Sequence, residues 1–431
     1  MQTGAALSER ERRLVAAVDP GRLEADLRSV VAVPSVTGDD GPIQDLMAAL
    51  VVDAGLALER VETDPAALAR DPDFPGIEVP RDRLPVVAGR LRGARPGPRL
   101  LVVAHVDVVP PGDPTTWTTP AFEPDVRDGD LYGRGANDMK GGLISALAAL
   151  RALAAVADPA ELAGDAVFVA VPSEEDGGAG MLAAIRAGYT GDQAVITEPT
   201  DLQIVVTQAG AITFRLTVPG RAAHASMRRE GVSALEKLEV LHAALRADEH
   251  ARNDAERDPR MRAIGLPYPT IIGRVSGGDW ASTVPDRIVA EGRYGVRAGQ
   301  TADEAEADLQ RCIDDAWESD PFLRQHQVGL EVFGGRFDSA HVDPDGPLAT
   351  GLRATAADVD GIAPAFIGVP YGADMRLLVN EGATPTVIYG PGDPRYAHAA
   401  DERVSLDQVV RCASVLAVWL DRRLRESPEP R

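Results

Sequence analysis

The chain has 431 residues, and its 44 Lys and Arg against 66 Asp and Glu give a formal net charge of −22 at pH 7. This acidic balance argues against a protein that binds nucleic acid or an anionic membrane through net charge, and it suits a cleft that binds cations. The two cysteines, Cys312 and Cys412, are too few for a disulfide framework or a thiolate metal site.

The first part of the chain predicts helices joined by polar connections. Residues 1–13 are polar and charged and predict no signal peptide, and no apolar run reaches the roughly 18 residues of a membrane span, so we expect a cytoplasmic protein. Residues 8–30 carry apolar side chains spaced for one face of one or two helices, and Gln44–Ala54 predicts another. Residues 64–85 are rich in Asp and Pro, lack a clear period and predict a surface loop.

A buried strand leads to the first candidate ligand. The apolar residues 100–104 predict this strand, which ends by presenting His105 and Asp107. Side chains two positions apart in an extended chain point to the same side, so the imidazole and the carboxylate can meet beyond the strand's end. An imidazole suits zinc or a similar transition metal, and a nearby carboxylate can orient it. Such a pair is by itself more often ordinary surface polarity, so the interpretation depends on what the rest of the chain brings to the same place.

A glycine-rich segment follows. Residues 131–142 contain glycines that permit tight turns, and they place Asp138 just ahead of an Ala- and Leu-rich helix predicted over residues 143–156. Asp138 is compatible with a metal ligand and equally with a helix cap, and the segment leaves both interpretations open.

Two further apolar strands end in acidic residues. Residues 166–171 are followed by Glu174 and Glu175, and residues 193–197 are followed by Glu198. Continuous apolar strands that alternate with helices predict an α/β domain with a mostly parallel sheet flanked by helices. Ligands bind beyond the carboxyl ends of the strands in such sheets, so we expect these carboxylates and the earlier histidine at one edge.

The pattern changes in the middle of the chain and resumes near its end. Residues 208–336 read as strand, helix, strand, strand, helix, strand, which is the order of a ferredoxin-like βαββαβ unit. We therefore expect a catalytic domain in two parts, 1–207 and 337–431, interrupted by this inserted domain. In the second part, a strand predicted at 386–390 leads to a loop that carries His398, a second imidazole at the same edge.

The collected side chains meet the requirements of two divalent ions that share one bridging carboxylate. The expected ligands are Asp138 as the bridge, His105 with Glu198 on one ion, and His398 with Glu175 on the other. Glu174 is left over, and because adjacent loop residues point in different directions it can face the bridging water as a general base. Such ions lower the pKa of water and polarise a carbonyl, which predicts hydrolysis of an amide.

Nearly the whole chain resembles the metal-dependent deacylase and peptidase family that contains acetylornithine deacetylase, succinyl-diaminopimelate desuccinylase, aminoacylase and the glutamate-releasing carboxypeptidases. The motifs that carry the resemblance are His105-Val-Asp107, the stretch from Gly133 to Gly142 with Asp138, Glu174-Glu175, Glu198-Pro199 and the late His398. The resemblance implies a zinc-peptidase-like fold, the ligand roles given above, and two zinc ions, which cobalt replaces in some relatives. It also implies that Asp107 acts in catalysis by orienting His105.

The resemblance extends to positions that would contact substrate. His224 matches the inserted domain's histidine, which stabilises the oxyanion in relatives, often from the partner subunit; a surface loop histidine is the alternative. Arg376 resembles an arginine that binds a substrate carboxylate through its bidentate fork, with a sheet-edge salt bridge as the alternative. Ser282 stands where relatives usually carry Asn, Gly392 lies on the His398 loop, and we assign both to substrate binding.

The prediction is therefore a zinc-dependent hydrolase that removes the acyl group from an N-acyl amino acid or a related amine. A dipeptidase or carboxypeptidase with the same dinuclear site is the alternative among enzymes. The alternative from another class is a catalytically inactive metal-binding module, against which Glu174 argues because it is not needed to hold metal. The expected partners are a small-molecule substrate and, by the resemblance, a second copy bound through the inserted domain, with no nucleic acid and no membrane.

Overall fold

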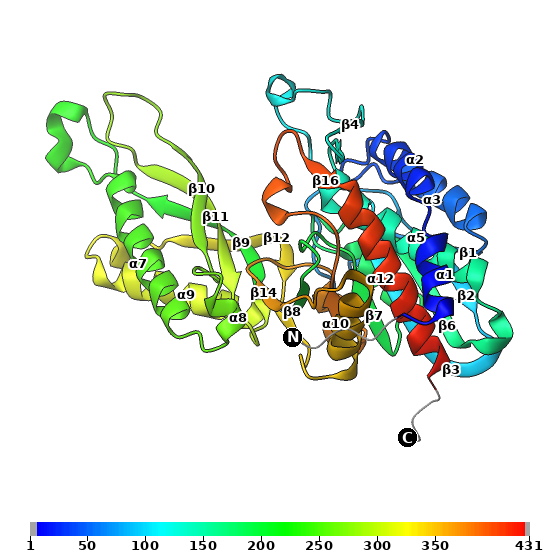
Figure 1. The fold of residues 1–431 in the computed structure, drawn as a ribbon. Coiled ribbons are helices and arrows are strands. Elements are labelled where there is room, and N and C mark those ends of the chain that lie inside the picture. The colour runs from blue at the N-terminus through cyan, green and yellow to red at the C-terminus, as the bar shows by residue number, and fades with distance from the viewer. Residues whose placement is uncertain (1–6, 427–431) are drawn as a thin grey trace. The chain divides into compact units, whose positions relative to one another are not determined.

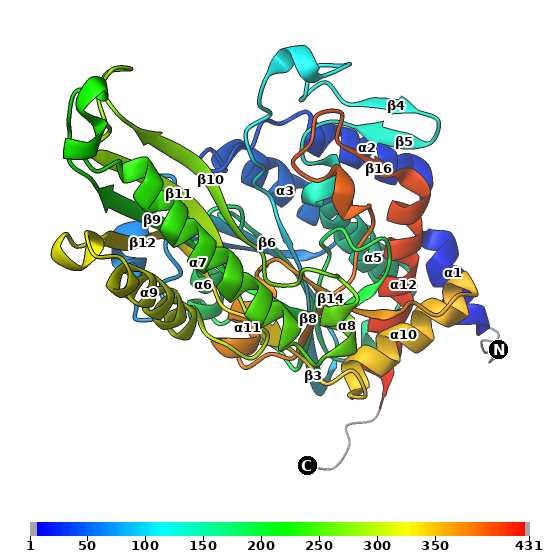
Figure 2. The same ribbon diagram turned by 90° about the vertical axis from the view of Figure 1, so that its left-hand side faces the viewer.

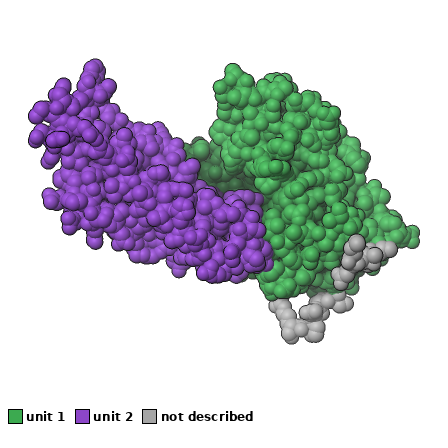
Figure 3. Space-filling view, turned by 60° about the vertical axis from the view of Figure 1, so that its left-hand side comes forward, with its two compact units in different colours: residues 1–206, 342–367, 374–431 green, residues 207–341, 368–373 purple. Residues whose placement is uncertain are grey.

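The computed structural model describes residues 7–426, and the chain divides into two units, shown in green and purple in Figure 3. The first unit contains the chain up to Val206, Val342–Ile367 and the chain from Asp374 onward; the second contains Thr207–His341 and Gly368–Ala373. The predicted boundaries at 208 and 336 lie within a few residues of this division. The short return of residues 368–373 to the second unit has no counterpart in the sequence prediction.

Most of a nine-stranded sheet lies in the first unit (Figure 1). In order across the sheet its strands are β1 (Ala57–Thr63), β2 (Leu84–Arg92), β6 (Ala163–Val171), β3 (Arg95–His105), β7 (Gln193–Ile196), β15 (Thr386–Ile388), β8 (Ile204–Gln208) and β13 (Ala340–His341), and β14 (Phe366–Val369) pairs with β8. The central neighbours β6, β3, β7 and β15 run parallel, whereas the pairs toward both ends, from β1 to β6 and from β15 to β13, are antiparallel. The parallel centre with its flanking helices confirms the predicted fold class. The antiparallel pairing at both edges of the sheet was not predicted from the apolar pattern.

The helix predicted after the glycine-rich segment is present as α5 (Gly141–Val156), and it packs against α12 (Leu406–Arg425) and against the sheet. Ser405 begins α12 by accepting the backbone N–H of Gln408, which satisfies one of the free donors of a helix's first turn. The stretch Ala136–Val156 is long and apolar enough to cross a membrane by length and composition, but most of it is buried inside this unit. Core packing therefore accounts for its composition.

The helical N-terminal region is confirmed, and the loop after it differs from its prediction. Asp19 caps α2 (Pro20–Val31) and separates it from α1 (Glu9–Ala17), and α3 (Gly41–Asp53) follows. Residues 64–85 contain a short helix, α4 (Pro65–Leu68), and part of this segment lies inside the protein: the Arg81 side chain is only 1% exposed. The surface-loop prediction is wrong here because composition does not reveal the buried carboxylates that Arg81 contacts.

The second unit has the element order that the sequence predicted. Its elements are β9 (Gly210–Pro219), α7 (Ala234–Asp254), α8 (Pro259–Arg262), β10 (Thr270–Gly277), β11 (Arg287–Val296), α9 (Ala302–Ser319) and β12 (Gly329–Phe337). The strands form an antiparallel sheet in the order β10-β11-β9-β12, with apolar residues of α7 and α9 in a common core with the sheet. This is the ferredoxin-like arrangement. Helix α7 extends beyond Leu245 through the charged residues as far as Asp254.

A small third sheet joins two distant parts of the first unit (Figure 2). It consists of β4 (Asp125–Arg127), β5 (Asp130–Tyr132) and β16 (Arg403–Ser405), and β16 pairs antiparallel with β5. The chain just before Asp138 therefore lies beside the chain just after His398. The remaining helices of this unit are α6 (Ala179–Arg186), α10 (Pro347–Asp360) and α11 (Met375–Asn380).

Candidate metal centre

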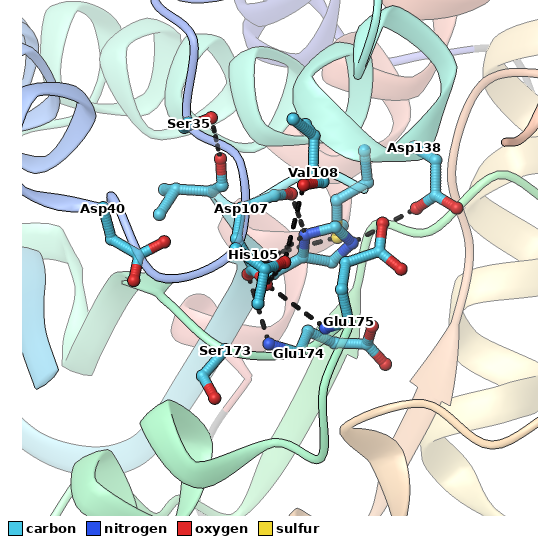
Figure 4. Close-up of polar contacts among 12 residues, drawn as sticks. Ser35, Asp40, His105, Asp107, Val108, Asp138, Ser173, Glu174 and Glu175 are labelled. Atoms are coloured by element: carbon cyan, nitrogen blue, oxygen red, sulfur yellow. Dashed lines mark hydrogen bonds and ion pairs between the residues drawn. The ribbon is translucent and has the colours of Figure 1, made fainter. Parts of the chain in front are cut away.

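His105 is the last residue of β3, and its imidazole is held in one orientation. Nδ1 lies 2.9 Å from the backbone carbonyl oxygen of Asp107, and Nε2 lies 3.2 Å from Asp138 Oδ1 and 3.6 Å from Glu198 Oε1. Because Nδ1 donates to the carbonyl, Nε2 is the ring nitrogen that faces the carboxylates, as in a histidine that binds metal. Figure 4 shows the Asp138 carboxylate facing the His105 ring.

Asp107 orients more than the neighbouring imidazole. Its carboxylate lies 3.7 Å from His105 Nδ1, too far for a hydrogen bond, so the backbone carbonyl of Asp107 takes the role expected of the side chain. The carboxylate instead accepts the backbone N–H groups of Glu174 at 3.1 Å and Glu175 at 3.3 Å, and the Thr37 hydroxyl at 3.0 Å. Asp107 thus fixes His105 through its main chain and the two glutamates through its side chain.

Asp138 lies between the two imidazoles. Its Oδ1 is 3.2 Å from His105 Nε2, and its Oδ2 is 3.4 Å from His398 Nε2. Helix α5 begins beyond it at Gly141, its N-cap residue is Lys140, and no side chain caps it, so the helix-cap interpretation of Asp138 is wrong. One carboxylate flanked by two imidazole nitrogens is the arrangement expected of a bridging ligand.

The glutamates after β6 and β7 complete the cluster. Glu175 Oε2 lies 3.2 Å from His398 Nε2, and Glu175 Oε1 is buried without a hydrogen-bond partner among the described residues. The ligand atoms of His105, Asp138 and Glu175 lie within 4.8 Å of one another, and those of His105, Glu174 and Glu198 do so as well. Glu174 therefore lies at the cluster too, beside His105 and Glu198.

The charges of this cluster suit cations. Burial, followed by the charge of Glu198, holds the pKa of Glu174 well above its usual range, and burial likewise raises the pKa values of Glu175 and Glu198. Burial disfavours the charged form of His105, but the carboxylates around it, Glu198 first, outweigh this and raise its pKa. Four carboxyl groups against two imidazoles make the cluster richer in acidic than in basic groups, and Glu175 Oε1, which has no hydrogen-bond partner among the described residues, is a free donor. Nitrogen and oxygen donors of this kind fit two divalent ions such as Zn²⁺.

His398 stands on the loop after β15, and a buried ion pair supports this loop. Hydrogen bonds with Asp138 and then Glu175 raise the pKa of His398 to about 10. Arg134 Nη1 lies 2.5 Å from Glu402 Oε2, both side chains are buried, and Arg134 Nη2 reaches the His398 carbonyl at 3.5 Å. Neither Arg134 nor Glu402 was predicted from the sequence. Glu402 follows His398 by four residues, but spacing gives no sign that it turns inward.

His224, predicted to stabilise the oxyanion, and Ser282, predicted to bind substrate, belong to the second unit. His224 and Ser282 lie on neighbouring segments, since the Ala225 N–H donates to the Ser282 carbonyl at 2.9 Å and His224 bridges to Thr283. The His224 side chain is exposed, and its Nδ1 lies 2.8 Å from Ser226 Oγ. The structure thus brings His224 and Ser282 together, and their roles toward substrate stay predictions.

Arg376 and Gly392, the other residues predicted to bind substrate, lie in the first unit and contact other parts of the protein. Arg376, on α11, is 1% exposed and donates a hydrogen bond to the Gly177 carbonyl, just beyond the two glutamates. Gly392 has φ +100°, and a Cβ there would lie 2.1 Å from Asn137 Oδ1. Its N–H donates to Gln408 Oε1 at 2.7 Å. Neither contact tests the predicted binding of substrate.

Comparisons with known proteins agree with this site. A sequence model of peptidase family M20/M25/M40 matches residues 101–422. The chain is 30% identical over 417 residues to succinyl-diaminopimelate desuccinylase of Methylobacterium sp. (strain 4-46), covering 94% of this chain and 96% of the relative. It is 28% identical over 353 residues to N-formyl-4-amino-5-aminomethyl-2-methylpyrimidine deformylase of Bacillus subtilis, covering 77% of this chain and 81% of the relative.

Solved structures share the fold over nearly the full length. A di-peptidase from Saccharomyces cerevisiae has a TM-score of 0.73 at 16% identity, covering 98% of this chain and 100% of that chain. An M20 family metallo-carboxypeptidase from Sulfolobus solfataricus has a TM-score of 0.71 at 16% identity, covering 93% of this chain and 98% of that chain. At these identities the likeness concerns the fold alone.

Proposed function

We propose, from the premise that the chain belongs to peptidase family M20/M25/M40 and is therefore a metal-dependent hydrolase of amide bonds, that its substrate is an N-acylated amino acid or a related N-acylated amine. The sequence relatives named above support this choice, because one acts on a succinyl amide and the other on a formyl amide. The reaction adds water across the amide, and it yields a carboxylate and a free amine.

The observation that carries the proposal is the position of Asp138 between His105 and His398, with further carboxylates on either side. The residues that would hold two ions are Asp138 as the bridge, His105 with Glu198, and His398 with Glu175. We propose zinc as the native metal, with cobalt as a substitute, because imidazole and carboxylate donors suit both ions. When bound, such ions polarise a carbonyl and make water a stronger acid.

Glu174 is the proposed general base. Neither ligand set requires it, and its backbone N–H is fixed by Asp107 beside that of Glu175. A carboxylate oxygen of Glu174 would take a proton from the attacking water and deliver it to the leaving nitrogen, so that the amine departs uncharged. His224 is proposed to stabilise the oxyanion, and Arg376, Ser282 and Gly392 are proposed to contact substrate.

The proposed assembly is a cytoplasmic homodimer formed through the second unit. Strand β10 is an edge strand of its sheet, and Ile271 and Val275 on it are 60% and 52% exposed. Trp280, which follows β10, is 74% exposed. An apolar edge strand favours pairing with another strand, and we propose a second copy as the partner. Sedimentation of the protein, beside an Ile271→Lys/Val275→Lys variant, tests this: a variant monomer supports it, and a monomeric unaltered protein contradicts it.

The test of the function is release of free amine from a panel of N-acetyl, N-succinyl, N-formyl and N-carbamoyl amino acids and of dipeptides, with zinc or cobalt present. Turnover of N-acyl amino acids above dipeptides supports the proposal. Turnover of dipeptides alone makes the chain a peptidase with the same site. Two bound ions with no turnover of any compound would contradict the proposal and favour an inactive metal-binding module.

A further inference from the structure

The turn formed by residues 173–178 carries Glu174 and Glu175. It is covered by a segment for which the sequence predicts no function. We call residues 71–81 the strap. Arg186 of α6 contacts Asp71 at 2.7 and 2.9 Å and Asp73 at 2.5 Å, which fixes one end of the strap. Phe74 and Ile77 pack with buried apolar residues that include Leu182 of α6. The strap is therefore docked on the helix that directly follows the turn.

The middle of the strap approaches the backbone of the turn closely. A Cβ on Gly177, whose φ is +140°, would lie 2.4 Å from the Gly76 carbonyl oxygen. The absence of a side chain at Gly177 is thus what permits this approach.

Asp176, at the end of the turn, is where strap and turn are joined. It is 3% exposed, and its carboxylate accepts the Ser173 hydroxyl at 2.5 Å and the backbone N–H groups of Val79 at 3.0 Å and Glu78 at 3.3 Å. Arg81 adds an ion pair, with Nη2 at 2.5 Å from Asp176 Oδ2. The buried Asp176 carboxylate therefore accepts hydrogen bonds both from Ser173, at the start of the turn, and from residues of the strap.

Arg81 links this junction to α3. Its Nη1 lies 3.3 Å from Oδ2 of Asp40, the residue that precedes α3, and both side chains are almost fully buried. Arg81 is therefore the counter-ion of Asp176 and also contacts Asp40, and its removal would leave the buried Asp176 charge without a cation. Figure 4 shows Asp40 and Ser173 beside Asp107, next to the two glutamates.

The turn is thus held from two sides. Asp107 binds the N–H groups of Glu174 and Glu175, while Asp176 binds the side chain of Ser173, which has φ +68°. This left-handed conformation is unfavourable for a residue other than glycine and persists only where contacts enforce it. Without the Asp176 contact, Ser173 would be free to relax, and the direction in which the next residue, Glu174, leaves the turn would change.

We propose that Arg81 is a positioning residue, which sets the location of the Glu174 carboxylate through Asp176 and Ser173. This inference rests on the proposed role of Glu174 as the base. A displacement of a reacting group by about 1 Å costs on the order of 100-fold in rate, so a distant clamp of this kind affects turnover. Because the ion pairs of Arg81 are with Asp176 and Asp40 and not with the proposed metal ligands, its loss should affect kcat rather than KM.

The test compares Arg81→Met and Arg81→Lys with a matched control, Arg10→Met, in the full-length protein loaded with zinc. Arg10 also pairs with a buried carboxylate, Asp421, but joins α1 to α12 and contacts neither the strap nor the turn in any of its hydrogen bonds. Thermal unfolding, kcat and KM are measured on a substrate found in the panel, with Glu174→Gln alongside. Hydrogen exchange of the peptide containing residues 173–178 is measured on the same proteins and does not depend on activity.

We expect Arg81→Met to lower kcat by about 10- to 100-fold with KM within about twofold, and to speed exchange in the 173–178 peptide by at least about tenfold. Arg81→Lys keeps one charged donor and should retain an intermediate kcat; this variant decides the matter if Arg81→Met does not fold. Arg10→Met should lose stability and keep its kcat and its exchange rate at the turn.

Two results would overturn the inference. One is that both Arg81 variants keep the kcat and the hydrogen-exchange rate of the unaltered protein while Glu174→Gln is inactive. Glu174 would then stay the proposed base, and Arg81 would have no role in positioning it. The other is an equal loss of kcat in Arg10→Met, which would reduce the effect to general destabilisation. A Glu174→Gln protein with full turnover would instead contradict the proposed base, and with it the purpose of the clamp.

Discussion

The carboxylate of Glu402 accepts the backbone N–H of Asp138 at 2.9 Å, although 264 residues separate the two in the chain. The same oxygen accepts the N–H of Asn137, and the other oxygen pairs with Arg134. Pairing of β5 with β16 brings these segments together. Glu402 therefore fixes the backbone of the proposed bridging ligand and, through Arg134, the loop of His398.

Replacement of Glu402 by Gln should weaken metal binding and stability together. The amide keeps an acceptor for the two N–H groups but leaves the Arg134 charge buried and unpaired, which costs about 3 kcal/mol of unfolding free energy. Loss of a contact that orients a ligand typically lowers metal affinity by about 10- to 100-fold. Competition with a zinc chelator and urea unfolding of the metal-free protein measure the two effects. Glu161→Gln, which alters an exposed partner of Arg10, is the control; unchanged zinc affinity in Glu402→Gln would contradict the assignment.

Metal removal should abolish turnover and destabilise the first unit. The cluster gathers four carboxylates that bound ions would neutralise, so the folded state depends on them. An ion present at about 1,000 times its dissociation constant contributes about 4 kcal/mol per site, and dialysis against a chelator removes this contribution. Calorimetric unfolding before and after dialysis, with turnover restored by zinc, is the measurement. Full turnover by protein that elemental analysis shows to be free of metal would refute the proposal.

Periodicity and strand ends were enough to predict the parallel centre of the sheet, because residues 100–104 and 166–171 are continuous apolar runs buried on both faces. The candidate ligands could be predicted for a related reason: the carboxyl ends of parallel strands meet at one edge, so His105 and Glu198 were bound to be neighbours. Each candidate ligand can thus be predicted from the local sequence of the strand that precedes it.

The supporting contacts could not be predicted in this way. Arg81 lies in a segment without a period, and its burial depends on Asp40 and Asp176, which reach it from two other parts of the chain. Glu402 looks like any loop carboxylate until β16 pairs with β5. The partners of Arg81 and Glu402 are determined by tertiary structure. A local sequence pattern does not indicate which distant group will contact a given side chain.

Asp40 should make stability depend on pH. Burial, followed by the charge of Asp107, raises the pKa of Asp40 to about 7, because Arg81 gives its shorter contact to Asp176. The folded pKa lies above the unfolded value of about 4, so the contribution of Asp40 is fully present below pH 4 and is lost as pH rises through 7. Asn at this position mimics the neutral carboxyl at every pH.

Relative to the unaltered protein, Asp40→Asn should therefore become more stable as pH rises from 5 to 7, by about 1.4 kcal/mol per pH unit. Urea unfolding of both proteins at pH 5, 6, 7 and 8, with metal present throughout, gives the difference at each pH. A difference that stays constant over this range would show that Asp40 is ionised in the folded protein and that Arg81 serves both carboxylates equally.

The neighbouring glutamates should separate into different roles. Glu174→Gln removes the proposed proton acceptor but no required ligand, so kcat should fall by about 100- to 10,000-fold while two ions stay bound. Glu175→Gln removes a carboxylate that lies 3.2 Å from His398, and it should bind one ion less tightly. Steady-state kinetics and elemental analysis of the same samples distinguish the two. If Glu174→Gln instead loses an ion, then its place within 4.8 Å of the donor atoms of His105 and Glu198 reflects ligation, and the base must be sought elsewhere.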